Sequence, residues 1–192
     1  SEGAVGLLQG YSMNSLWGYK TDGYWKSREE YLAYKTANPG YQSFNDGMVS
    51  GVDVKYVAQG KADHTIGQGG GTPQSPGDLV YLGDSNGRYL FGMNLSFQWK
   101  NFDFGMMWQG IGKRKILIDT NTLAPFASTS NMPWTIHRDY WTADNQDAFW
   151  PRLYSGNTFN YHPSDKWVQN AAYIRLKNVQ LGYTVPLKKT LV

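Results

Sequence analysis

A strict two-residue alternation is the feature that most constrains this sequence. Over residues 89–99 every second side chain is large and apolar, and most of the side chains between them are small or polar. A period of two is that of a β-strand with one apolar face. After Lys100 and Asn101 the alternation resumes at residues 102–108, and a two-residue connection between such runs predicts a tight hairpin.

Two other segments carry weaker strand patterns. Residues 173–185 alternate in their second half and end before Pro186, which cannot donate to a strand ladder. Residues 16–24 alternate over a shorter stretch. We therefore expect strands at about 16–24, 89–99, 102–112 and 173–185, with long loops at about 25–88 and 113–172.

An apolar face of this width has to be covered by a second sheet or by lipid. At about 3.3 Å per residue, the first run is about 36 Å long, and a tilt near 40° projects it to about 28 Å. That length is close to the apolar band of an outer-membrane barrel, about 25 Å, and exceeds the usual strand of a sandwich. The length favours lipid. The alternative is a soluble, aromatic-rich glycan-binding β-sandwich module.

The first long loop contains two local signals. Residues 67–77 have the Gly, Ser and Pro composition of a flexible linker. Ahead of them, Ser27 and Glu30 form a helix-start pattern, and Asn38 followed by Pro39 and Gly40 forms a stop. We expect a short helix between these signals.

Composition excludes several classes of function. The chain has no Cys, which excludes a disulfide framework, a thiolate metal site and a cysteine nucleophile. The charge balance of 18 basic and 15 acidic side chains gives +3, too little to indicate nucleic-acid binding. No apolar run approaches the roughly 18 residues of a membrane helix.

The sequence gives little support for an enzyme. No catalytic, nucleotide-binding or metalloprotease motif is present. His64, His137 and His162 lie too far apart for a metal-ligand pattern, so we expect no metal and no cofactor. A glycosidase pair drawn from Asp139, Asp144 and Asp147 is the third-ranked interpretation.

Several spaced motifs resemble the SusC/RagA-type TonB-linked outer-membrane proteins of Bacteroidetes. The matching stretches are residues 10–12, 17–24 (WGYKTDGY), 76–79 (PGDL), 92–112, 140–142 (YWT), 145, 151–153 (PRL) and 170–186 (NAAYIRLKNVQLGYTVP). They cover nearly the whole chain in the family's order. One departure is at residues 56–63, where many relatives carry an Asp-rich hairpin resembling a calcium loop and this chain lacks most of the carboxylates.

The resemblance implies an all-β fold, a section of a large antiparallel transmembrane β-barrel of the TonB-dependent transporter type with long extracellular loops. Residues 1–192 would be part of one barrel domain, with the plug domain and the last strands absent. The implied function is import of glycans or peptides across the cell outer membrane together with a SusD-like surface lipoprotein. TonB would act through the absent plug, and the lipid of the outer membrane would be a further partner.

Strand parity assigns two faces to such a section. The side chains expected to face lipid are Tyr89, Phe91, Met93, Leu95, Phe97, Trp99, Phe102, Phe104, Met106, Trp108, Val179, Leu181 and Tyr183. Those expected to face the lumen or the plug are Asn94, Ser96, Gln98, Asp103, Gln109, Asn178 and Gln180. Polar side chains are expected where a barrel meets water or a plug.

Two further sets are expected to make contacts outside the bilayer core. Arg114, Arg175 and Lys177 have outward parity near the long-loop side, so we expect them to meet lipopolysaccharide phosphates or to extend to water. The second long loop is rich in aromatic residues, which suit sugar rings or a partner surface. The candidates for ligand or partner contact are Trp134, Tyr140, Trp141, Trp150 and Tyr154. The alternative for each is packing within a small core of the loop itself.

Overall fold

The computed structural model describes residues 5–6, 10–44, 46, 49–60, 64–67, 69, 75–118, 123–128, 131–142, 144–156 and 158–186. Its elements are β1 (Val5–Gly6), β2 (Ser15–Tyr19), β3 (Thr21–Tyr24), α1 (Arg28–Ala37), β4 (Val54–Tyr56), β5 (Leu79–Asp84), β6 (Arg88–Trp99), β7 (Phe102–Lys113), β8 (Lys115–Leu117), three 3-10 turns (Thr135–Arg138, Phe159–Tyr161, Asp165–Trp167), β9 (Val168–Asn170) and β10 (Tyr173–Tyr183). They form two compact units, one of Ser1–Ser85 with Ile116–Gln169 and one of Asn86–Lys115 with Asn170–Val192. Over the described ranges, no helix has the length and apolar character that crossing a membrane requires.

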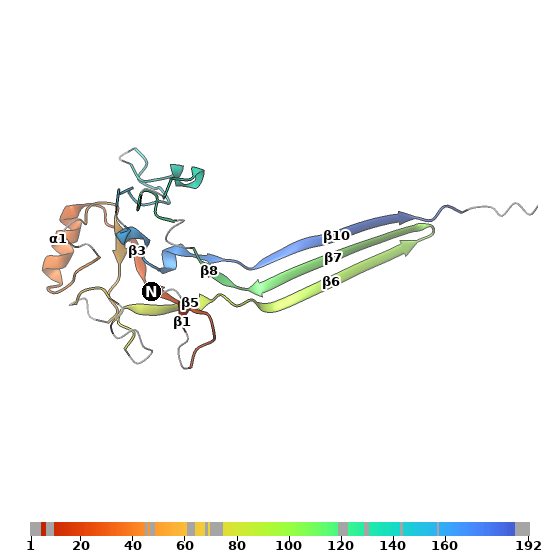
Figure 1. Cartoon of the computed structure of the whole chain (residues 1–192), viewed down its shortest axis with the longest axis horizontal. Coiled ribbons are helices and arrows are strands. Elements are labelled where there is room, and N and C mark those ends of the chain that lie inside the picture. The colour runs from red at the N-terminus through yellow and green to blue at the C-terminus, as the bar shows by residue number, and fades with distance from the viewer. Residues whose placement is uncertain are drawn as a thin grey trace, which may run out of the picture. The chain divides into compact units, whose positions relative to one another are not determined.

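The second unit is a single antiparallel sheet in the order β10-β7-β6, shown by the three long arrows of Figure 1. β6 and β7 have 12 residues each and are joined by Lys100 and Asn101, with Trp99 paired to Phe102. Lys100 has a φ of 53°, a left-handed conformation of the kind that tight hairpin turns require. The two alternating runs of the sequence thus become the two longest strands, with bounds within a residue of those expected.

A close approach in the middle strand of this sheet requires a glycine. A Cβ placed on Gly110 of β7 would lie 2.3 Å from the ring of Phe91 and 2.6 Å from the carbonyl oxygen of Tyr173. The Phe91 ring therefore covers the main chain at Gly110, where a side chain would have no room. Gly92 on β6 differs, because a Cβ there would meet only the carbonyl oxygen of Trp108, at 3.8 Å.

The segment expected as one strand over 16–24 is divided between two sheets of the first unit. β2 pairs with β1 and β5, whereas β3 pairs with β4. All five residues of β2 are buried, and the amide of Tyr19 donates to the carbonyl of Pro163 at 2.8 Å. This segment is not a strand of the β10-β7-β6 sheet. The alternation of apolar and polar residues over 16–24 is too short to distinguish a barrel strand from a strand that is buried on both faces.

Helix α1 begins and ends where the capping signals place it. Ser27 is the N-cap and accepts from the amide of Glu30 at 3.2 Å. In a capping box the Glu30 carboxylate would accept from the amide of the N-cap, Ser27. Here it accepts instead from the amide of Lys26, one residue earlier, at 2.7 Å. At the other end the Asn38 amide donates to the Tyr34 carbonyl at 2.9 Å.

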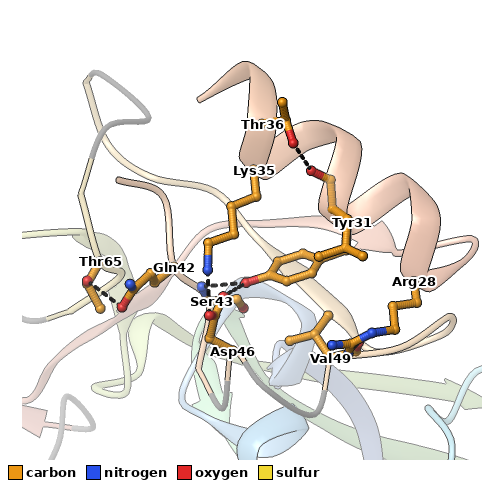
Figure 2. A network of polar contacts seen from close by, with 10 residues as sticks. Arg28, Tyr31, Lys35, Thr36, Gln42, Ser43, Asp46, Val49 and Thr65 are labelled. Carbon is orange, nitrogen blue, oxygen red and sulfur yellow. Dashed lines mark hydrogen bonds and ion pairs between the residues drawn. The ribbon is translucent and has the colours of Figure 1, made fainter. Parts of the chain in front are cut away.

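One face of α1 is attached to the segment that follows it (Figure 2). The Tyr31 hydroxyl donates to Asp46, and the Lys35 ammonium lies 2.6 Å from the same carboxylate. Arg28 donates to the carbonyl of Val49 at 2.7 Å. Because Tyr31 is also buried in the core, the helix is held by both packing and charge.

The first unit has two clusters of buried side chains, both built largely from segments expected as loops. The larger contains Tyr19, Trp25, Tyr31, Tyr41, Val49, Val54, Tyr56, Ala58 and Ile66. The smaller contains Leu123, Ala124, Trp150, Tyr161 and Trp167. The segments 25–88 and 113–172 therefore carry folded cores of their own. Hydrogen bonds link them: Asn160 accepts from the Val54 amide at 2.8 Å, and the Tyr56 hydroxyl donates to the Phe159 carbonyl at 3.0 Å.

We predict that Gly110→Ala destabilises the full-length protein and that Gly92→Ala, on the neighbouring strand, does not. The added methyl group at 110 has to displace the Phe91 ring or the main chain of β10, and overpacking of this kind costs about 1–3 kcal/mol. Urea unfolding of the purified protein in detergent measures the difference. Equal midpoints for the two variants would contradict the close approach at Gly110.

Candidate functional site

The apolar side chains of the three-stranded sheet lie in rows across one face. Residues paired directly across antiparallel strands point to the same side of a sheet. The rows are Leu95–Met106–Val179, Phe97–Phe104–Leu181 and Trp99–Phe102–Tyr183, and Met93 pairs with Trp108 in the next row. All the paired residues expected to face lipid therefore lie on one side, which we call the apolar face.

This apolar face is open to its surroundings. Met93 is 45% exposed and Leu181 is 72% exposed. Every residue of β6 is exposed, and so are Val179 and Tyr183 of β10. A patch of large apolar side chains as wide as three strands marks a surface that meets a partner or a membrane. The described part of the chain places no second layer on it, as a sandwich would require.

The opposite side of the sheet, which we call the polar face, carries the residues expected to face the lumen. Its rows are Gln98–Asp103–Gly182, Ser96–Gly105–Gln180, Asn94–Met107–Asn178 and Gly92–Gln109–Arg175, followed by an apolar row, Leu90–Ile111–Tyr173, at the end away from the tight turn. The Asp103 carboxylate lies over Gly182, where a Cβ would fall 2.3 Å from one of its oxygens. The two faces thus differ sharply in chemistry although they share one layer of backbone.

A β-bulge at Lys177 changes the face of the upper half of β10. The pairing moves from Leu176↔Trp108 directly to Asn178↔Met107, so Lys177 is the extra residue. Above it, Ile174 and Leu176 lie opposite Gly110 and Trp108 and continue the apolar face. Arg175 lies opposite Gln109 on the polar face and donates to its side-chain oxygen at 3.4 Å.

Because of this bulge, Arg175 and Lys177 do not have the outward orientation from which we expected them to contact lipopolysaccharide. Uninterrupted alternation would place Arg175 and Lys177 with Val179 on the apolar face. The extra residue instead turns Arg175 to the polar face, and Lys177 lines a hollow there with Asn94 and Gln109. Arg114, which follows β7, is exposed. The sequence does carry a sign of the bulge, because the apolar residues change from even numbers (Ile174, Leu176) to odd numbers (Val179, Leu181) across Lys177 and Asn178.

Aromatic side chains gather at the end of the apolar face beside the tight turn. Phe102 and Tyr183 have ring centroids 4.6 Å apart. The Lys100 ammonium lies 4.8 Å from the Trp99 ring centroid. Amphipathic rings with a cation next to them are typical of the boundary between hydrocarbon and water in membrane proteins.

The five aromatic contact candidates of the second long segment divide into exposed and enclosed residues. Trp134, 62% exposed, and Tyr140 line an open groove of about 470 Å³ together with Phe126, Arg138 and Leu153. Trp141 is half-buried. Trp150 is only 5% exposed and stacks on Trp167 with centroids 5.3 Å apart. Trp150 is therefore a core residue, and the contact expected of it is withdrawn.

Tyr154 belongs to a buried polar network that the sequence did not indicate. Its hydroxyl donates to Asp53 at 3.1 Å, and the Asn160 amide donates to the same carboxylate at 2.9 Å. The amide of Ser50 also donates to Asp53, at 2.8 Å. Burial raises the pKa of Asp53, an effect that these donors oppose. The network joins residues from both long segments, so its role is in the fold of the unit.

A second buried carboxylate gives the Pro-Gly-Asp motif a structural role. Asp78 accepts from the amides of Gln59 at 2.7 Å and Gly67 at 2.9 Å. His64 Nε2 lies 2.9 Å from the same carboxylate. Asp78 thereby holds the segment that precedes it in place. Residues 61–63 of that stretch lie outside the described residues.

Three of the other residues considered for catalysis or metal binding, His137, His162 and Asp139, lie in local structural contacts. His137 accepts from the Trp134 amide at 2.8 Å, and His162 stacks on Phe44 at 3.8 Å. Asp139 accepts from the Phe149 amide at 3.0 Å, and this hydrogen bond lowers the pKa of Asp139. A lowered pKa keeps the carboxylate ionised, which is unsuited to a general acid. Asp144 and Asp147 are exposed.

Comparisons with known proteins agree with this geometry. The chain is 27% identical over 97% of its length to TonB-dependent receptor P26 of Formosa agariphila, and it covers 17% of that protein. It resembles a chain of the RagAB peptide importer in its closed-closed state with a TM-score of 0.52, at 15% identity over 94% of this chain and 18% of the other. The open-open state gives a TM-score of 0.49. No protein-family model matches the chain.

These findings confirm the resemblance to SusC/RagA-type TonB-linked outer-membrane proteins. The fold is an all-β section of a transmembrane β-barrel, and its location is the outer membrane. The chain spans less than a fifth of the length of the proteins it matches.

We predict that Trp150→Ala destabilises the first unit and that Trp134→Ala leaves it intact. Removing a buried Trp costs about 3–5 kcal/mol, whereas truncating an exposed one usually changes stability by under about 0.5 kcal/mol. Limited proteolysis of the full-length protein, followed by mapping of cuts within residues 116–169, measures the effect. Faster cleavage of the Trp134→Ala variant than of the Trp150→Ala variant would contradict the assignment.

Proposed function

We propose that this chain is part of the wall of a TonB-dependent transporter that imports a glycan or a peptide. The observation that carries the proposal is the register of the β10-β7-β6 sheet, which separates an exposed apolar face from a polar face. A sheet with this division suits a wall between lipid and a polar lumen. The similarity to a TonB-dependent receptor supports TonB as the energy source for import.

The height of the apolar face supports the same function. From Phe91 to Trp99 the face extends over about 30 Å of strand, and a tilt near 40° projects this to about 23 Å. That matches the apolar band of outer-membrane barrels, about 25 Å. In this arrangement Trp99, Phe102 and Tyr183 form an interfacial girdle at the turn side, and Arg114 reaches lipopolysaccharide at the long-loop side.

The remaining partners belong to the full-length protein. A SusD-like surface lipoprotein would deliver the solute, and TonB would act through a plug domain. The groove beside Trp134 and Tyr140 is exposed and aromatic, which suits a sugar ring or a partner side chain. The RagAB complex is named a peptide importer, which keeps peptides beside glycans as candidate solutes. The proposal therefore assigns transport and binding to this chain.

We predict opposite outcomes for lysine at two adjacent residues of β6. Leu95→Lys places a charge in the Leu95–Met106–Val179 row, where a cation near the bilayer midplane costs about 2–4 kcal/mol. Ser96→Lys places the same charge on the polar face. The amount of folded protein in the outer membrane, measured by heat-modifiable mobility on gels, should fall for Leu95→Lys. It should stay at the wild-type level for Ser96→Lys.

Uptake provides the functional measurement for the same two variants. Cells carrying the wild-type or the Ser96→Lys protein should accumulate a labelled glycan or peptide only when TonB is present, and cells carrying Leu95→Lys should not accumulate it. A panel of both solute types identifies the substrate class. Equal assembly of both lysine variants, or uptake of the identified solute that persists without TonB, would contradict the proposed function.

A further inference from the structure

The polar face of the β10-β7-β6 sheet is hollowed beside the bulge. The hollow has a volume of about 410 Å³ and is lined by Leu90, Phe91, Gly92, Asn94, Met107, Trp108, Gln109 and Lys177. Gly92 leaves its floor open, because a side chain there would stand between Leu90 and Asn94 with only main chain near it. The hollow is wide enough for a small polar group and is bordered by amides.

Positive charge gathers at this hollow. Lys177 lines it, and Arg175 lies in the same row as Gly92 and Gln109. The Arg175 guanidinium donates to Gln109 at 3.4 Å and lies 5.4 Å from the Tyr173 ring. Those contacts use a minority of its five N–H donors.

Negative charge on the described part of this face is distant. Among the residues of β6, β7 and β10, the acidic side chain is Asp103, in the row next to the tight turn. It lies six residues from Gln109 along β7, which is about 20 Å. That separation exceeds the Debye length at physiological salt, about 8 Å, so Asp103 does not neutralise the two cations.

The bulge is what gives the polar face these cations. Unbroken alternation would carry Arg175 and Lys177 to the apolar face, where charge is disfavoured. One extra residue moves both to the side of the hollow. Bulges often re-aim side chains near functional sites, and cations lining a lumen select anions.

We propose that Arg175 and Lys177, with the amides of Gln109 and Asn94, form a subsite for an oxyanion of the transported solute. The group is a carboxylate or a sulfate, bound by charge-assisted N–H donors, while the amides bind adjacent hydroxyl or carbonyl groups. A lipid phosphate is on the wrong side of the sheet to reach it. The proposal rests on the proposed function, because it requires the polar face to line the solute path.

The test measures the electrostatic potential at the hollow in the full-length protein. The chain itself has no Cys, so a single Asn94→Cys can be placed in a background freed of any other cysteine. Its reaction rates with an anionic methanethiosulfonate (sulfonatoethyl) and a cationic one (trimethylammonioethyl) are compared in outer-membrane vesicles. Adding Arg175→Gln and Lys177→Gln should lower the anionic-to-cationic rate ratio by roughly 3- to 10-fold. Inorganic phosphate should slow the reaction more than chloride at equal ionic strength.

Matched cysteines separate failure of the subsite from failure of the proposed function. Ser96→Cys, on the same face, should react with both reagents, and Leu95→Cys, on the apolar face, should react with neither. If Leu95→Cys reacts and Asn94→Cys does not, the two faces are reversed and the proposed function fails. If Leu95→Cys is inert and Ser96→Cys reacts, but Arg175→Gln and Lys177→Gln leave the anionic-to-cationic rate ratio of Asn94→Cys unchanged, the subsite alone is overturned. An Asn94→Cys that is inert while Ser96→Cys reacts also overturns it, because polypeptide then fills the hollow.

Discussion

The structure depends on one constraint, the fixed pairing of β10, β7 and β6. That register gathers most of the bulky apolar side chains of the three strands on one face and the amides, Ser96 and Asp103 on the other. A single layer cannot bury either face by itself. Within the part of the chain that the structure describes, its outer strands β6 and β10 pair on one side only, and a bilayer does not tolerate open strand edges, which a closed barrel removes. In the proposed function this sheet is a wall with hydrocarbon outside, neighbouring strands at both edges and a polar lumen inside.

In the proposed transporter, the bulge at Lys177 lies where the wall would leave the hydrocarbon. Below it, alternation alone keeps Val179 and Leu181 on the apolar face. Above it, the shift brings Ile174 and Leu176 to that face and withdraws Arg175. One extra residue thus lengthens the apolar face and moves positive charge to the polar face. The bulge at Lys177 therefore affects both the stability of the wall in lipid and the proposed selectivity of the solute path for anions.

Periodicity in the sequence predicted the features that depend on neighbouring residues of one strand or helix. The bounds of β6, β7 and α1 follow from alternation, a two-residue turn and a serine cap. It missed features that depend on pairing across the chain. The division of 16–24 into β2 and β3, the burial of Trp150 against Trp167, and the Asp53 network with Tyr154 and Asn160 all require contacts between distant segments. The bulge was missed because Arg175 and Lys177 were assigned to the outward face by unbroken alternation, although the apolar residues change from even to odd numbers between Leu176 and Val179.

The central claim is that the row through Met93 and Met106 contacts acyl chains. The most direct measurement is fluorescence quenching by lipids brominated on their acyl chains, with the full-length protein labelled by an environment-sensitive probe at Met93→Cys or at Asn94→Cys. The account predicts strong quenching of the probe at residue 93 and little at residue 94. Equal quenching at both residues, or none at residue 93, would contradict it.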